Sequence, residues 1–340
     1  MMTALGTLEL RALDQFPPEA VDELLARYEF YPYRHWRGFG LEVPKRLLRW
    51  DLLNGETTEL ALRLLAMEGL RPVGLACIIP SRWESEQLDT KLAEIRHLIT
   101  VGNGEQRRCI TGALVEFMRQ QLSGTVDCLV HRVDSADAVT VAMLEAYRFH
   151  LVDTTVSFVS GPGIVPFIRR TFPRPCAVRL CREEDWPEVE VIVRERGFAG
   201  RFYNDPRLDR ARCDVLYREW ARLAVQGVFA DEVVVALRHG RVAGFLSYQW
   251  QPGAYEVAKI RLRGRGLLAV GSAYKGLALE LIRGAILWDE KAEFRQFDTQ
   301  LNNHEFWTLL NRGLRMDVAH VRHVFHGWLN APPAQEQGRF

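Results

Sequence analysis

The feature that most constrains this chain is a pattern that occurs twice. In each half, an apolar strand ends in a similar segment just before a helix: Leu98-Ile99-Thr100-Val101-Gly102 and Leu267-Leu268-Ala269-Val270-Gly271. The surrounding order also repeats as a strand, one or two helices, a hairpin, the echoed strand, a helix, a strand, a helix and a strand. The repetition predicts two similar α/β domains. The length of 340 residues agrees, because single cores stop growing near about 250–300 residues.

Apolar periodicity and turn residues place the expected elements. In the first half we expect strands at 8–14, 59–68, 73–80, 93–101, 126–133 and 150–159, and helices at 17–29, 109–122 and 137–149. In the second half we expect strands at 177–181, 258–270, 293–301 and 318–329, a hairpin at 231–250, and helices at 186–197, 212–227, 276–290 and 302–313. Glycines, prolines and a basic pair mark a linker between the halves. The predicted domains are therefore 1–160 and 176–332, with a linker at 161–175 and a tail at 333–340.

Charge and composition exclude several classes of function. Lys and Arg number 44 against 43 Asp and Glu, so the net charge is +1, and no overall field attracts a nucleic acid or an anionic membrane. The chain shows neither a long apolar run nor the layout of a secretory signal at its start. The six cysteines are scattered without a C-x-x-C pair, which predicts reduced thiols and no zinc site. We therefore expect a cytoplasmic protein with neither metal, nucleic acid nor membrane as partner.

Several ordered motifs resemble one superfamily. In the first half they are Trp83-Glu84-Ser85-Glu86 followed by AEIRHL, and the stretch RVDSADAVTVAMLEAYRFHLVDTTVSF. In the second half they are RFYNDPRL, LYREWA, DEVVVA with GRVAGFLS, DTQLNN and VFHGWL. These motifs span nearly all of 57–330 and resemble the GNAT acetyltransferase superfamily, within it the dTDP-fucosamine acetyltransferase group. The resemblance implies two tandem GNAT-like domains, each with a mixed, mostly antiparallel sheet, flanking helices and a splayed fourth strand.

The resemblance also implies a reaction and a set of contacts. It implies acyl transfer from acetyl-CoA, or another acyl-CoA, to the amine of a small molecule such as an amino sugar nucleotide, by direct attack on the thioester. In the second half it assigns cofactor contacts to Leu267, Leu268, Ala269, Val270, Lys275, Gly276, Leu277, Ala278 and Asn302. An alternative cofactor site in the first half would use Leu98, Ile99, Thr100, Val101, Gln106, Arg107, Arg108, Cys109, Ile110 and Thr111. A third possibility is a non-catalytic binding or scaffold protein that keeps the fold.

Departures from the superfamily's phosphate loop leave these alternatives open. Its glycines let the backbone approach a pyrophosphate, but the first half has Cys109 and Thr111 at those positions. The second half keeps Gly276 and Ala278, yet its loop is two residues shorter than that of the first half. The tyrosine that serves many members as general acid aligns with Leu309. Either half could therefore hold the acyl donor, and neither shows the usual acid.

Other polar residues have both functional and structural interpretations. Arg201, Phe202 and Tyr203 are candidates for acceptor binding in a loop, or for packing beside an Asp-Pro turn. Tyr203 and His326 are candidates for a catalytic side chain. On a strand, His323 points away from His320 and His326, which excludes a three-histidine metal site. Arg96 and His97 are candidates for a base, or for the solvent-facing side of a strand. Arg107 and Arg108 are candidates for a phosphate clamp, or for a solvated basic loop.

Overall fold

The chain forms two compact units that are not the two halves of the sequence. The computed structural model describes residues 8–40, 42–55, 62–172, 176–196, 198–264 and 266–329. The first unit takes its described residues from Met1–Tyr31, Leu48–Asp153 and Arg322–Phe340, and the second from Pro32–Leu47 and Thr154–Val321. The tail expected at 333–340 lies outside the described residues. The division differs from the expected boundaries at 160 and 176 because three segments belong to the other unit.

The first unit is built on a mixed sheet. Its strands are β1 (Leu8–Leu13), β2 (Leu62–Glu68), β3 (Arg71–Pro80), β4 (Leu92–Thr100), β5 (Cys128–Asp134) and the last part of β13 (Asp317–Trp328). β1 to β4 pair antiparallel in that order, β4 and β5 pair parallel, and β5 pairs antiparallel with β13. Mostly antiparallel pairing with one parallel pair is the mixed arrangement that the sequence predicted.

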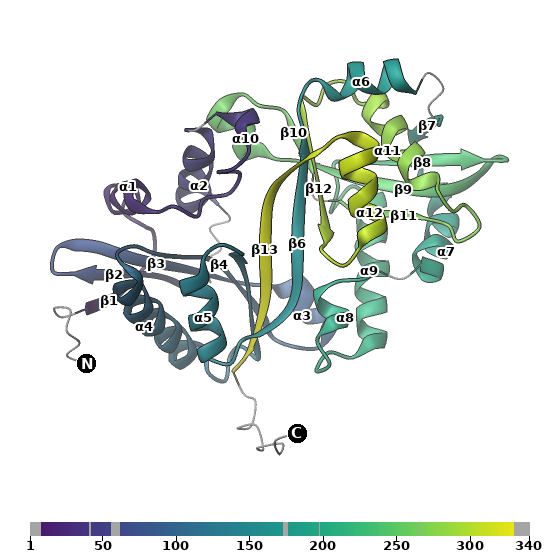
Figure 1. Cartoon of the computed structure of the whole chain (residues 1–340). Coiled ribbons are helices and arrows are strands. Elements are labelled where there is room, and N and C mark those ends of the chain that lie inside the picture. Colours follow the sequence, from purple (N-terminus) through teal and green to yellow (C-terminus); the bar gives the residue numbers. More distant parts are fainter. Residues whose placement is uncertain are drawn as a thin grey trace, which may run out of the picture. The chain divides into compact units, whose positions relative to one another are not determined.

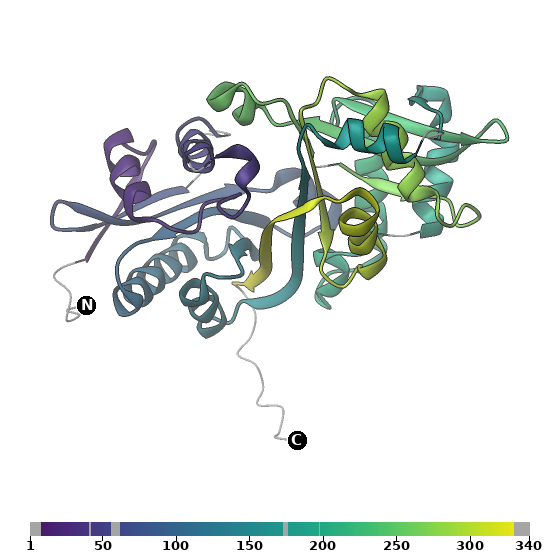
Figure 2. The ribbon, with the colours of Figure 1, turned by 45° about the horizontal axis from the view of Figure 1, so that its top comes forward.

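Helices cover both faces of this sheet (Figures 1 and 2). They are α1 (Pro18–Arg27), α2 (Val43–Asn54), α3 (Arg82–Leu88), α4 (Gly104–Leu122) and α5 (Ala138–Ala146). Alternation along β2 to β4 sends one set of apolar side chains to α4, where Leu114 is fully buried. The opposite set meets α1 and α2 through Leu24 and Leu52. Two cores therefore hold the sheet between helix layers.

The second unit repeats the plan. Its strands are β6 (His150–Ser160, from Thr154 on), β7 (Val178–Leu180), β8 (Glu232–Arg238), β9 (Arg241–Trp250), β10 (Leu262–Gly264), β11 (Leu268–Val270) and β12 (Phe294–Gln300). β7, β8 and β9 pair antiparallel, and β9 then pairs antiparallel with both β10 and β11. β10 runs parallel to β12, which pairs antiparallel with β6. The strand expected at 258–270 is thus divided into two short strands.

Helices also flank the second sheet. They are α6 (Ile164–Thr171), α7 (Trp186–Arg196), α8 (Arg201–Asn204), α9 (Arg210–Val225), α10 (Pro252–Ala258), α11 (Leu277–Trp288) and α12 (His304–Thr308), the last followed by a π-helical turn at Leu309–Gly313. Leu281 and Ile282 of α11 are fully buried in the main core of this unit. The structure therefore confirms the fold class, a mixed sheet flanked by helices in each unit.

The expected linker at 161–175 is wrong in part, because α6 occupies Ile164–Thr171. Ile164 and Ile168 lie one helical turn apart and are both buried in the core of the second unit. Pro166 stands in the first turn, where the missing N–H has no intrahelical acceptor to lose. Counting glycines and prolines concealed this amphipathic helix.

Strand pairing explains why the units depart from the halves. The strand expected to close the first half pairs, from Thr155 to Ser160, with β12 of the second unit. The last strand of the chain pairs, from Arg322 to Trp328, with β5 of the first unit. Apolar alternation defines the buried face of a strand but not which neighbour it pairs with. The exchange of these strands was therefore absent from the sequence analysis.

The segment Pro32–Leu47, which includes the first turn of α2, also belongs to the second unit. Trp36 and Phe39 are buried against Phe294 of β12, with ring centroids 5.3 and 5.1 Å away in edge-to-face geometry. Tyr33 adds a hydrogen bond to Gln296. Aromatic pairs of this kind contribute roughly 0.5–1.5 kcal/mol beyond their buried area, so this segment is a structural part of the second unit.

The place of the last strand can be tested at Gly327. A Cβ on Gly327 would lie 2.4 Å from the ring of Phe149, which is itself buried. We expect Gly327→Ala to lower the free energy of unfolding by about 1–3 kcal/mol, because the ring must shift in a packed core. Urea denaturation measures the change. Gly163→Ala, where a Cβ would meet nothing within 4 Å, is the control and should stay within about 0.5 kcal/mol; equal stability of the two variants would contradict the packing.

Candidate functional site

A bulge separates two parallel strands in the second unit. β10 pairs with β12 only at Leu262 and Arg263. On β9, Gly264 is paired with Gln249 and Leu268 is paired with Leu246. The segment from Gly264 to Leu268 therefore contains one residue more than the segment of β9 that it faces. This extra residue is a β-bulge, which bends a strand and changes its direction. Beyond it β11 pairs with β9 alone among the described strands, and the two parallel strands have separated.

The bulge is held by a serine. The Ser247 N–H donates to the Leu267 carbonyl (2.9 Å), and the Leu267 N–H donates back to Ser247 Oγ (2.7 Å). A Cβ on Gly266 would lie 1.7 Å from the Ser247 carbonyl oxygen, so only glycine fits there. These contacts determine which backbone groups of β11 turn toward β9.

Alternation then identifies the backbone groups that face the opening. Leu267 and Gly271 both hydrogen-bond to β9, and in an antiparallel pair every second residue does so. The main chain of Ala269 therefore also faces β9, whereas the N–H and C=O groups of Leu268 and Val270 point to the side from which β12 has withdrawn. Of the four residues predicted here, Leu268 and Val270 offer free main-chain groups to a ligand.

The loop after β11 leads to a helix whose N-terminus has no side-chain cap. Gly276 occupies the N-cap position of α11 with φ of 87°, a conformation that costs glycine little. Leu277 N–H donates to Tyr274 O (3.1 Å), and the Leu277 side chain is buried in the core. The next N–H groups, those of Ala278 and Leu279, belong to the first turn and have no intrahelical acceptor. Lys275 is exposed beside them, so this end favours an anion.

Two carboxylates lie near this loop. Ser272 donates from its N–H (3.2 Å) and its hydroxyl (2.8 Å) to Glu195 at the end of α7. These two hydrogen bonds lower the pKa of Glu195, so it is ionised at neutral pH. Glu280 of α11 accepts instead from Arg283 Nη1 (2.7 Å), which compensates its charge. Glu195 therefore places an ionised carboxylate beside this loop.

The first unit contains the same bulge and separation. Cys77 of β3 is paired with His97 but Ile78 with Ile95, so Arg96 is the extra residue on β4. The parallel pairing of β4 with β5 ends at Ile95 and His131. Beyond this point the register turns the main-chain groups of Leu98 and Thr100 away from β3. The geometry of the second unit is thus repeated here.

In this unit, however, an arginine spans the opening. Arg107 Nε donates to the Thr100 carbonyl (3.1 Å), and Nη2 donates to both carboxylate oxygens of Asp137 (2.7 and 2.6 Å). The Phe30 ring lies 5.0 Å from the guanidinium. Arg107 and Asp137 are both buried. The phosphate clamp considered for Arg107 is therefore wrong, because its guanidinium is committed to Asp137 and Thr100.

The helix N-terminus in the first unit is also occupied by its own side chains. Asn103 caps α4: Gln106 N–H donates to Asn103 Oδ1, and Asn103 N–H donates to Gln106 Oε1, both at 3.0 Å. This capping box satisfies donors that an anion would otherwise use. Ile110 and Thr111 are buried, whereas Cys109 is half-buried and Arg108 exposed. Of the ten candidates in this half, only Arg108 presents a free charge at the helix start.

Polar residues also gather at the bulge of β4. Asp51 of α2 lies 2.8 Å from Arg96 Nη2 and 3.1 Å from His97 Nε2. Burial acts to raise the pKa of Asp51, but the hydrogen bond and charge of His97, together with Arg96, hold it well below the usual range. His131 Nδ1 lies 2.6 Å from the Ile95 carbonyl, and burial lowers the pKa of this histidine to about 4. His131 is therefore neutral, and Asp51 is a partner of Arg96 and His97 that the sequence analysis did not single out.

The predicted acceptor residues form the short helix α8 rather than a loop. Phe202 is buried, and the Arg201 guanidinium lies 4.4 Å from its ring centroid. Tyr203 donates to Asp214 Oδ1 (2.6 Å) and stacks on Tyr217 with ring centroids 5.6 Å apart. Burial and the Asp214 carboxylate raise the pKa of Tyr203, so its hydroxyl stays protonated and is engaged with Asp214. These contacts favour the packing interpretation for Phe202 and Tyr203.

The remaining candidates are His326, Asn302 and the position of Leu309. His326 is fully buried and is paired with Val130 of β5, so it belongs to the first unit and not to the second. Asn302 is exposed in the turn after β12. Leu309 begins the π-helical turn and packs against the main core of the second unit. Within the described residues, no group of three or more His, Cys, Asp or Glu side chains is arranged to hold a metal ion.

Comparisons with known proteins place this architecture among GNAT folds. No family model and no curated protein matches the chain. A tandem GNAT protein from the clavulanic acid biosynthesis pathway is 16% identical, with 96% of this chain and 100% of that chain covered at a TM-score of 0.52. A GCN5-related N-acetyltransferase from Sphaerobacter thermophilus is 12% identical, with 96% and 97% covered at a TM-score of 0.57.

A third structure has the same fold within a longer chain. It is a GCN5-related glucosamine N-acetyltransferase region of a fungal multi-domain GH3 β-N-acetylglucosaminidase, 12% identical, with 94% of this chain and 38% of that chain covered at a TM-score of 0.54. At such identities the likeness defines the fold. The chain therefore has a tandem GNAT fold. Within its described residues, no helix combines the length and apolar character needed to cross a bilayer.

The role of Arg107 can be tested by removing its charge. We expect Arg107→Met to destabilise the protein by about 3–5 kcal/mol, since the buried Asp137 carboxylate loses its counter-ion. Chemical denaturation measures the change. Arg108→Met, the exposed neighbour, should stay within about 0.5 kcal/mol. A small effect at Arg107 would show that the opening in the first unit does not depend on this ion pair.

Proposed function

We propose that the chain is an N-acyltransferase that takes an acyl group from acetyl-CoA, or another acyl-CoA, and transfers it to the amine of a small molecule. The supporting observation is the free edge of β11, where the main-chain groups of Leu268 and Val270 face the opening left by β12. Extended backbone of this kind can pair with the amide-containing arm of CoA, and an N–H can stabilise charge that develops on a thioester oxygen. The uncapped end of α11, one loop away, suits the pyrophosphate.

The reaction needs little from the protein beyond positioning. The neutral amine nitrogen forms a bond to the thioester carbonyl carbon, the carbon–sulfur bond breaks, and the amine loses a proton. The CoA thiolate leaves and takes a proton, for which water is the donor in this proposal, because Leu309 stands where relatives have a tyrosine. Holding the amine against the carbonyl contributes most of the rate. No covalent acyl-enzyme is required.

The second unit is the better candidate for the acyl donor. In the first unit, Arg107 uses the Thr100 carbonyl on the strand edge, and Asn103 with Gln106 caps the helix. In the second unit, neither the edge of β11 nor the start of α11 has such a partner among the described side chains. The alternative in which the first unit binds the donor would require Arg107 Nε to release the Thr100 carbonyl.

The acceptor class is open to direct measurement. Purified protein would be screened for acyl-CoA-dependent release of free thiol over small amines, with amino sugars and their nucleotide derivatives first, because one structure of this fold is a glucosamine N-acetyltransferase region. Isothermal titration with acetyl-CoA separates an enzyme from a scaffold. Absence of binding at millimolar acetyl-CoA would contradict the proposal and favour the non-catalytic alternative.

Gly276 offers a test of the donor site. We expect Gly276→Asp to weaken acetyl-CoA binding at least tenfold, because the new carboxylate would cap the helix and repel the pyrophosphate. Gly240→Asp is the matched control: both glycines have positive φ, 87° and 77°, and a Cβ at either would meet nothing within 4 Å. The two variants should lose similar stability, but only Gly276→Asp should lose affinity for acetyl-CoA.

Arg108→Ala tests the first unit. If this variant loses acetyl-CoA affinity and Gly276→Asp does not, the donor binds in the first unit.

Glu195 offers a second test, in the opposite direction. We expect Glu195→Gln to tighten acetyl-CoA binding several-fold at low ionic strength, because it removes the carboxylate held at the Ser272 N–H and hydroxyl. The gain should shrink as salt rises. Glu190→Gln on the same helix, whose natural carboxylate pairs with Arg194 at 2.7 Å, is the control. Titration calorimetry measures both, and unchanged affinity in Glu195→Gln would exclude this loop as the phosphate site.

A further inference from the structure

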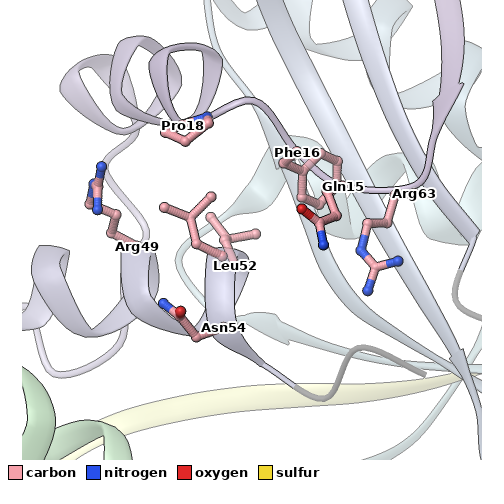
Figure 3. A pocket seen from close by; sticks show the side chains of 8 residues that line it. Gln15, Phe16, Pro18, Arg49, Leu52, Asn54 and Arg63 are labelled. Carbon is pink, nitrogen blue, oxygen red and sulfur yellow. The ribbon is translucent and has the colours of Figure 1, made fainter. Parts of the chain in front are cut away.

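The first unit contains a pocket that the proposed acyl transfer does not use. It has a volume of about 350 Å³ and lies among the chain after β1, the start of α1, the end of α2 and the start of β2 (Figure 3). Its walls are Gln15, Phe16, Pro18, Arg49, Leu52, Leu53, Asn54 and Arg63. Sites for small molecules usually start at about 300 Å³ and combine apolar walls with a few polar groups, and this pocket has that composition.

Its unusual feature is Arg63 on β2. The side chain of Arg63 is nine-tenths buried, with 7% of the residue exposed. Its Nη1 donates to the main-chain carbonyl of Asp14 at 2.9 Å. Among the residues that the structure describes, no carboxylate lies within ion-pair distance of Arg63. Arg63 is thus a buried cation for which the described residues supply no counter-ion.

The other arginine of the pocket shows the contrast. Arg49 is held by Asp22 through two hydrogen bonds of 2.5 and 3.0 Å, so its charge is compensated. In Figure 3, Arg49 lines one end of the pocket and Gln15 and Arg63 line the other, with Leu52 between them. An uncompensated charge in a poorly hydrated place is costly. An anion bound at the Arg63 end would remove that cost.

We propose that this pocket binds a small organic carboxylate with an apolar body. A guanidinium presents paired N–H donors that match the two oxygens of a carboxylate. The Gln15 and Asn54 amides can add hydrogen bonds, while Phe16 and Leu52 receive the apolar part. One arginine with two neutral amides suits a single charge better than the double charge of a phosphate. The pocket lies on elements remote in sequence from β11 and α11, so this proposal does not depend on the acyl-transfer proposal.

The test uses the full chain and defined probes. Hexanoate and benzoate are titrated by calorimetry, with hexan-1-ol, benzyl alcohol and inorganic phosphate as matched ligands that lack the carboxylate. We expect saturable binding of the two carboxylates with Kd at or below about 1 mM, and at least tenfold weaker binding of the alcohols and of phosphate. Equal binding of an alcohol or of phosphate would overturn the assignment, as would no binding of either carboxylate.

Variants assign the binding to Arg63. Arg63→Met should lower carboxylate affinity at least tenfold. Arg63→Lys, which keeps the charge but loses the paired N–H donors of the guanidinium, should lower it at least threefold. If Arg63→Met does not fold, Arg63→Lys alone provides the test. Arg119→Met is the control, since Arg119 lies on α4 at the opposite face of the sheet and donates to the Tyr147 carbonyl. Retained affinity in both Arg63 variants would overturn the proposal. Gly276→Asp should bind hexanoate normally, so failure of the acyl-donor site and failure of this pocket are distinguishable.

Discussion

The separation of two parallel strands is the constraint on which the rest of the structure depends. Each unit has one parallel pair in an otherwise antiparallel sheet, and in each the pairing ends at a bulge, next to Ile95 in the first unit and to Gly264 in the second. Backbone polar groups left by a departing strand need other partners. How each unit supplies those partners decides what it can bind.

The two units supply them differently. In the first, Arg107 bonds to the Thr100 carbonyl and Asn103 caps the following helix, so side chains of the unit replace a ligand. In the second, a shorter loop leads to Gly276, and the edge of β11 keeps groups that a ligand can use. One repeated plan thus has a closed version and an open version, and the open version is the one to which we assign the proposed acyl transfer. The first unit keeps a different opening, the pocket at Arg63.

Much of the fold was predictable, because it follows from local patterns. The repeated order, the hairpin at 231–250 and the strand residues within 258–270 follow from periodicity and turn residues, and the structure confirms the resulting fold class. The helix at 164–171 was missed because prolines and glycines concealed its apolar spacing. The site was less predictable. In the sequence, Arg107 and Arg108 look like two equivalent cations. Only the tertiary structure shows that Arg107 is paired with Asp137, thirty residues later in the chain.

The sequence by itself determined the repeated plan of the two halves and the alternation that buries each strand, because these depend on residues close together in the chain. The tertiary structure decided that β6, from the first half of the sequence, pairs with β12 in the second unit, and that β13, from the second half, pairs with β5 in the first unit. It also decided that Asp51 meets His97 and that Arg63 is buried with no carboxylate of the described residues beside it. Pairing partners and buried charges are set by contacts across long separations, which spacing along the chain does not specify.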